Sequence, residues 1–215
     1  MARRRGERAA APLESVLDLA AEPGTRADLQ GLRGHATVFT SPLSETHAML
    51  VAEADRVEPH DRVRASALRA TAALTCDMGG DLREADEMAR RALARAGSAG
   101  RSIATMVLAH VTAINGQVDE ALALLEPILK SLESIDPLGE LSFVLSGTAE
   151  SLALIEQWSH ARKVFDRIIG AARTAGAPAV LPFPLAVFSE FELRHGKNRC
   201  GIRRGRRIRP ARRRD

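Results

Sequence analysis

The chain repeats itself at intervals of 36 to 40 residues, and this periodicity limits its fold more than any other feature. Four ten-residue stretches align without gaps: SPLSETHAML from Ser41, GDLREADEMA from Gly80, GQVDEALALL from Gly116 and EQWSHARKVF from Glu156. A possible fifth start, Gly196, follows 40 residues after the fourth. A small residue stands five positions after each of the four starts, at Thr46, Ala85, Ala121 and Ala161. Another stands seven positions before all five starts, at Gly34, Ala73, Ala109, Ala149 and Ser189.

Each unit has the pattern of a helical hairpin. Small residues at matching depths let two antiparallel helices approach closely, and larger apolar residues recur around them with the period of a helix. Gly80 and Gly116 can adopt the positive φ that ends a first helix, and Asp81 and Asp119 can cap the second helix. The breakers at Gly97 to Gly100 are expected in a connector. We predict helix pairs at 27–40 with 43–56, 62–78 with 82–96, 101–115 with 118–133 and 140–155 with 159–175, then a lone first helix at 181–194.

The composition also favours helices. Aromatic residues make up only 3% of the chain and tyrosine is absent, whereas strands are enriched in aromatic and β-branched residues. The net charge of +4 comes from the two ends of the chain. Residues 194–215 hold 11 of the 31 basic residues and one of the 27 acidic ones, which leaves 20 basic and 26 acidic residues elsewhere. This distribution excludes a uniformly basic nucleic-acid-binding domain.

The small residue seven positions before a turn glycine, and the alanine five positions after it, resemble the tetratricopeptide repeat. The chain is still more similar to the divergent repeats in the middle of large LuxR-type (MalT-like) transcriptional regulators, whose units read G-x-x-x-E-A at this looser spacing. The similarity covers about residues 27–196, with Glu156 in place of a glycine and Trp158 two positions later. The stretches that carry it are MGGDLREADEMARRALARAG, INGQVDEALALLEPIL and IEQWSHARKVFDRIIGAARTAGAP.

The expected fold class is therefore all-α, a tetratricopeptide-like helical-hairpin solenoid of four pairs plus an incomplete fifth. We expect a poorly ordered N-terminal segment at 1–26 with a short helix near 12–22, a helical repeat domain at 27–194 and a basic disordered tail at 195–215. In the LuxR-type regulators an ATPase module precedes the repeats and a helix-turn-helix follows them. The chain has no P-loop motif and no apolar-periodic C-terminal stretch. The resemblance thus implies a sensor region that lacks its ATPase and DNA-binding domains, apparently truncated, with neighbouring regulator domains as partners if it is a fragment.

In a solenoid of this kind the first helix of each pair lines a concave groove. Positions three, six and ten before each turn start should face it, and they combine an apolar floor with carboxylates and histidines. Such a groove suits a protein segment or a small effector. The candidate groove residues are Leu74, Asp77, Met106, His110, Glu150 and Glu190. Solvated or half-buried helix positions without a ligand are the alternative interpretation.

No pattern in the sequence indicates an enzyme. The six histidines show no metal-ligand spacing such as H-x-x-x-H, so we expect neither a metal nor a cofactor. No motif such as G-x-S-x-G marks a nucleophile. Cys76 lies four positions before a turn start, where a buried structural thiol is expected.

The C-terminal tail allows three interpretations. Its cations could bind nucleic acid or an acidic partner through counterion release, and the chain would then be a free-standing repeat adapter. The arginines concerned are Arg203, Arg204, Arg206, Arg207 and Arg209. Alternatively, the abrupt change to Arg, Gly and Pro inside the fifth unit indicates a frameshifted or truncated end. The apolar face of Phe183, Phe188 and Phe191 would then lack its partner helix, and self-association would follow. An inert disordered end is the third possibility.

The sequence predicts a cytoplasmic protein without membrane contact. Its two cysteines, Cys76 and Cys200, are far apart and form no disulfide framework. Glu14 and Asp18 interrupt the apolar stretch that follows the basic N-terminus. The longest apolar run, 177–188, contains three prolines and is too short to span a bilayer.

Overall fold

The computed structural model describes residues 16–17, 19–139 and 142–196, and this part of the chain contains nine α-helices and no strand. The all-α prediction is confirmed for these residues. The helices are α2 (Pro23–Thr37), α3 (Leu43–Val57), α4 (Arg62–Gly79), α5 (Leu82–Leu93), α6 (Ser98–Ile114), α7 (Val118–Lys130), α8 (Ser142–Leu154), α9 (Trp158–Thr174) and α10 (Pro182–Arg194). Two short 3-10 helices, η1 (Leu132–Ser134) and η2 (Pro178–Val180), follow α7 and α9.

The helix bounds lie close to the predicted ones, with two informative differences. Helix α2 begins at Pro23 rather than at residue 27, because proline suits the first turn and the Glu22 carboxylate caps the helix. Helix α6 begins at Ser98, so the expectation of a connector through Gly100 is wrong. Gly100 belongs to α6, where a Cβ atom would lie 2.9 Å from the Cα of Ala67 in α4. Of the helix predicted near 12–22, residues 12–15 and 18 lie outside the described residues, 16 and 17 are helical, and 19–22 are not helical.

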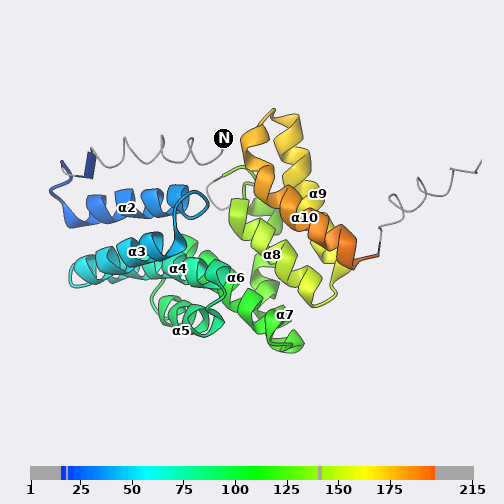
Figure 1. Ribbon diagram of the computed structural model, residues 1–215, viewed down its shortest axis with the longest axis horizontal. Helices are drawn as coiled ribbons and strands as arrows, with labels where there is room; N and C mark the ends of the chain where they lie inside the picture. The colour runs from blue at the N-terminus through cyan, green and yellow to red at the C-terminus, as the bar shows by residue number, and fades with distance from the viewer. Residues whose placement is uncertain (1–15, 18, 140–141, 197–215) are drawn as a thin grey trace, which may run out of the picture.

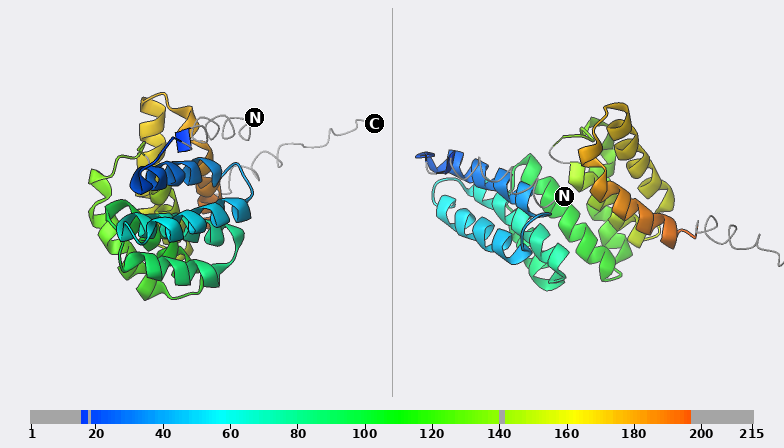
Figure 2. Two further views of the ribbon diagram at one scale, coloured as in Figure 1. Left: turned by 90° about the vertical axis from the view of Figure 1, so that its left-hand side faces the viewer. Right: turned by 45° about the horizontal axis from the view of Figure 1, so that its top comes forward.

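The helices pack in chain order. Figure 1 shows α2 to α5 at one end of the molecule, α6 and α7 in the middle and α8 to α10 at the other end. Helix α4 packs against α2, α3, α5 and α6, and α6 packs against α4, α5, α7 and α8. Helix α8 then packs against α9 and α10. The turned views in Figure 2 show the same succession. Helices α2, α4, α6, α8 and α10 therefore form one continuous row of neighbours, with α3, α5, α7 and α9 beside it.

The small residues of the repeat lie at the contacts between paired helices. The four residues five positions after the turn starts are buried: Thr46 at 3% exposure, and Ala85, Ala121 and Ala161 at 0%. Gly34 is also buried, and a Cβ atom there would lie 2.6 Å from Cδ2 of Leu50 on the partner helix α3. The corresponding Ser189 in α10 is exposed, because no described helix follows α10 to cover it.

The ends of the first helices repeat one hydrogen-bonded cap. Gly80 and Gly116 have φ values of 83° and 75°, as predicted. Glu156 has a φ of 61° at the equivalent position and is the non-glycine residue with positive φ in the described part of the chain. After each of these residues, the next backbone N–H donates to a carbonyl five residues earlier, as from Gln117 to Thr112 at 3.0 Å.

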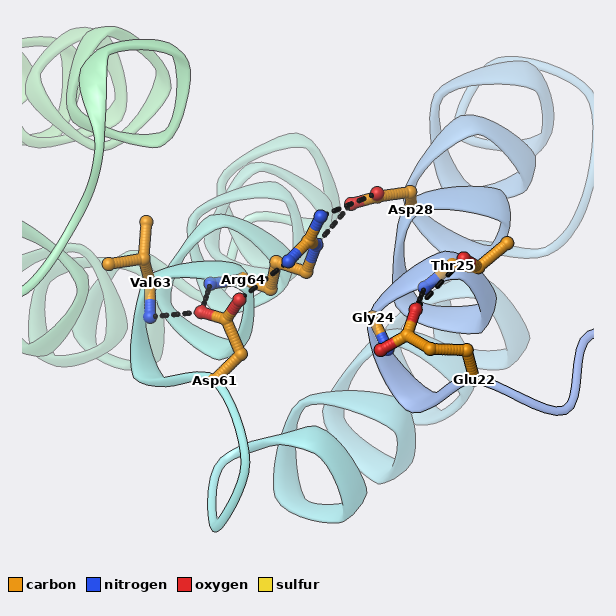
Figure 3. Close-up of polar contacts among 7 residues, drawn as sticks. All are labelled: Glu22, Gly24, Thr25, Asp28, Asp61, Val63 and Arg64. Carbon is orange, nitrogen blue, oxygen red and sulfur yellow. Dashed lines mark hydrogen bonds and ion pairs between the residues drawn. The ribbon is translucent and has the colours of Figure 1, made fainter.

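Side-chain carboxylates cap the N-termini of several helices. The Asp81 carboxylate accepts from the backbone N–H of Glu84 at 3.1 Å, as expected, whereas Asp119 lies in the first turn of α7 and makes no capping hydrogen bond. Figure 3 shows the neighbouring starts of α2 and α4, which Glu22 and Asp61 cap. Arg64 joins the two helices, with its guanidinium 2.8 Å from Asp28 of α2 and 2.6 Å from Asp61.

Aromatic side chains close the C-terminal end. Phe191 of α10 is 2% exposed, and its ring centroid lies 5.4 Å from Phe165 and 5.9 Å from Trp158, both in α9. Phe188 stacks beside it and Phe183 contacts Phe39. The three rings thus pack against α9 and the loop after α2, and the partner helix that a complete fifth unit would supply falls outside the described residues.

Candidate ligand-binding site

One cavity brings together five of the six predicted groove residues. It has a volume of about 290 Å³ and is lined by Leu74, Asp77, Met106, His110 and Glu150. They come from α4, α6 and α8, three successive helices of the continuous row. Their side chains converge because they occupy neighbouring positions on helices that lie next to one another. The sixth residue, Glu190 of α10, lies outside this cavity and lines a much smaller adjoining hollow that it shares with Glu150.

Five further residues line the cavity and were missed by the sequence analysis. They are Phe39, Met78, Phe143, Gly147 and Phe183. Phe39 and Met78 each stand two positions before a turn start, and Phe143 and Phe183 each stand 13 positions before one. These shared offsets could have identified the four residues as part of the lining. In the N-terminal units the cavity is lined by residues at the ends of the first helices, and in the C-terminal units by residues at their beginnings. A fixed set of three offsets before the turn start could not include both.

Aromatic and sulfur-containing side chains form the apolar walls. Phe39, in the loop after α2, contacts Phe183 at the start of α10 with ring centroids 5.2 Å apart, so residues 144 positions apart in the chain meet at the rim. Met106 lies against the backbone of α8 at Gly147, where a Cβ atom would be 2.5 Å from its sulfur. Gly147 therefore leaves room for the Met106 side chain at the cavity wall. The aromatic and thioether groups give the cavity polarisable walls.

His110 and Asp77 form the central polar pair of the cavity. The Nδ1 atom of His110 lies 2.9 Å from both carboxylate oxygens of Asp77, and the two side chains are 16% and 6% exposed. Burial alone would lower the pKa of His110, but the hydrogen bond to Asp77 and the charges of Asp77, Glu150 and Glu190 outweigh it and raise the pKa. The pair therefore favours a protonated imidazole held by a carboxylate.

Glu150 is the carboxylate with spare hydrogen-bonding capacity. Its Oε1 atom lies 3.9 Å from Nε2 of His110, which is too long for a hydrogen bond. Among the described residues, no other group forms a hydrogen bond or ion pair with it, and its side chain is 29% exposed. Burial raises the pKa of Glu150; the His110 charge opposes this, and Glu190 and Asp77 add to it. Glu190 itself is neutralised by Arg194 at 2.8 Å.

Two other hollows differ in character. A hollow of about 320 Å³ between α2, α4 and α6 is lined mainly by apolar and small residues, with His35 at its edge toward Phe143. A larger hollow of about 600 Å³ lies between α3, α4 and α5 and contains several arginines and carboxylates. Its Arg69 is already paired, 2.8 Å from both Asp55 and Glu58, and its lining lacks the aromatic walls of the first cavity. We therefore take the cavity around Asp77, His110 and Glu150 as the candidate site, although it is not the largest.

The remaining predicted features give no second site. Among the described residues, no group of three or more His, Cys, Asp or Glu side chains is arranged to hold a metal ion. The Cys76 thiol is half-buried 3.3 Å from Nδ1 of His47, and burial raises its pKa to about 11. No helix in the described part of the chain has the length and apolar character needed to cross a bilayer. The tail arginines Arg203, Arg204, Arg206, Arg207 and Arg209 lie outside the described residues.

Comparison of the chain with models of protein families, with curated proteins and with solved structures finds no match.

Proposed function

We propose that the chain is a non-catalytic binding module that takes a small effector or a protein segment on the face formed by α2, α4, α6, α8 and α10. The proposal includes a tetratricopeptide-like solenoid of four helix pairs and an incomplete fifth. The row of first helices, the buried small residues at Ala85, Ala121 and Ala161, and the cap that recurs at Gly80 and Gly116 support this arrangement.

The observation that carries the proposal is the cavity itself. Its lining comes from α4, α6, α8, α10 and the loop after α2, so its shape depends on how successive units stack. It combines apolar walls with a few converging polar groups, Asp77, His110 and Glu150, which is the usual composition of a ligand site. Its volume of about 290 Å³ is at the small end for such sites and favours a small effector over a long segment.

The resemblance to LuxR-type regulators extends the proposal to signalling. A ligand that contacts several units would stabilise one curvature of the array and so change the surfaces offered to neighbouring domains. We propose such a sensor role in the cytoplasm, where a free thiol such as Cys76 stays reduced.

Methionine-methyl NMR tests the proposal directly. The chain has five methionines, of which Met78 and Met106 line the cavity, whereas Met49 and Met88 lie elsewhere and serve as internal controls. The chain labelled at its methionine methyl groups is titrated with a library of water-soluble fragments and short peptides. We expect some of these to shift Met78 and Met106 without shifting the controls.

The matched variant is Gly147→Ala, whose new methyl group forces the Met106 side chain to shift at the cavity wall. This variant should weaken the binding of those fragments and peptides, while the methyl signals of the control methionines stay unchanged. If no fragment or peptide shifts Met78 and Met106, the proposed binding function is wrong.

A further inference from the structure

The charges around the cavity do not cancel. With His110 protonated, its charge offsets that of Asp77, whose two oxygens its Nδ1 atom contacts at 2.9 Å. Arg194 offsets Glu190 at 2.8 Å. The same imidazolium lies 3.9 Å from Glu150, so Asp77, Glu150 and His110 together keep one net negative charge. Glu150 has no hydrogen-bond partner among the described residues, and its side chain is 29% exposed at the cavity wall. The cavity thus holds a carboxylate that a cationic ligand would satisfy.

The walls suit the same kind of ligand. The rings of Phe39, Phe143 and Phe183 line the cavity, and the faces of aromatic rings attract organic cations. Met78 and Met106 add polarisable contacts for an apolar chain. An anionic ligand would instead meet a carboxylate in a partly desolvated site, which costs free energy.

We infer that the cavity binds a small organic cation, an ammonium group on an apolar body, with the ammonium beside Glu150 and the body between the phenylalanine rings. This inference rests on the proposed binding function and names its ligand class. The cavity volume of about 290 Å³ can enclose a whole small molecule of this kind, and we assign the site to such a molecule rather than to a lysine side chain presented by a partner protein.

Asp77 and Glu150 have different tasks in this assignment. Asp77 is 6% exposed and holds His110 through two contacts, so it fixes the imidazole. Glu150 contacts His110 only at 3.9 Å and can turn its free oxygen lone pairs to the ligand. Glu150 is thus the specificity-determining residue. Glu150→Gln should change the preference of the cavity for cations more than it changes the shape of the cavity.

The experiment compares three probes of one shape: hexylammonium, hexan-1-ol and hexanoate. Each is titrated into the full chain at pH 7, with the methyl signals of Met78 and Met106 reporting occupancy of the cavity. We expect hexylammonium to bind about tenfold more tightly than hexan-1-ol, and hexanoate to bind more weakly than both. Glu150→Gln should lower the affinity for hexylammonium about fivefold or more and leave that for hexan-1-ol within about twofold. Glu126→Gln, the same change at an exposed site on α7, should alter neither affinity.

The outcomes separate the two proposals. Equal affinities for hexylammonium and hexan-1-ol would overturn the cation assignment while keeping a binding cavity. Unchanged hexylammonium affinity in Glu150→Gln would overturn the role of that residue. Tighter binding of Nα-acetyl-lysinamide than of hexylammonium would assign the site to a partner's lysine and overturn the small-molecule ligand. Failure of every probe and every library compound to shift Met78 and Met106 would overturn the binding function as well.

Discussion

Glu156 occupies a backbone conformation that glycine adopts without strain, so Glu156→Gly should stabilise the protein. Its φ of 61° lies in the left-handed region, at the position where Gly80 and Gly116 end the equivalent helices. The side chain is exposed, and no described residue forms a hydrogen bond or ion pair with its carboxylate. The substitution therefore changes the backbone preference and little else.

The expected gain is the difference between two effects. A residue with a Cβ atom in the left-handed region costs about 1–2 kcal/mol, whereas glycine loses about 0.5–1 kcal/mol more backbone entropy on folding. From the midpoints of these two ranges, the net increase in the free energy of unfolding is about 0.75 kcal/mol. For a chain of this size that gain raises the melting temperature by about 1–4 °C. Urea unfolding followed by circular dichroism measures the change in the free energy of unfolding.

Two control variants isolate the backbone effect. Glu156→Ala removes the carboxylate but keeps the Cβ atom, so it should give no comparable gain. Gly116→Ala introduces a Cβ atom at a φ of 75° with no atom within 4 Å of it, so its loss of about 1 kcal/mol would be conformational. If Glu156→Ala stabilises as much as Glu156→Gly, the effect comes from the side chain and the reasoning is wrong.

Three further outcomes can be checked. Gly34→Ala should destabilise the protein by about 1–2 kcal/mol in urea unfolding, because the new methyl group meets Leu50, which is 0% exposed; a gain would show that the pair is loosely packed. The raised pKa of His110 stabilises the fold fully below pH 6.5, and that stability is lost as the pH rises through the folded-state value. Asp77→Asn should flatten this decline above pH 6.5, and an unchanged slope would exclude the pair as its source. With its pKa raised to about 11, about one Cys76 thiol in a thousand is ionised at pH 8. Peptide mass spectrometry should therefore show slow alkylation of Cys76 by iodoacetamide, and labelling as fast as that of glutathione would contradict its burial.

Local sequence signals were sufficient for the helices. Gly80 and Gly116 end their helices with a positive φ, and a small residue such as Ala121 marks a close helix contact, because both effects act within one unit. The predicted start of α6 was three residues too late, because a glycine such as Gly100 usually indicates a helix break when only the local sequence is considered. Its place inside the helix depends on the backbone of Ala67, which belongs to another unit.

The candidate site could be predicted only in part for the same reason. Counting back from the turn starts identified Asp77, His110 and Glu150, since these lie at similar distances from the ends of neighbouring helices. The same counting also gave Glu190, which lies outside the cavity, and it missed the contact between Phe39 and Phe183. The rotation between successive units decides that contact, and it accumulates from the packing of many side chains.

The sequence by itself determined the helices, their pairing and the small residues buried between them, because hydrophobic period, capping and helix-ending residues act over a few positions of one chain segment. Only the tertiary structure decided that three carboxylates and a histidine from four helices gather near one cavity, and that Glu150 has no hydrogen-bond partner among the described residues. Distances between units depend on how the whole row of helices stacks, and no pattern confined to one unit contains that information.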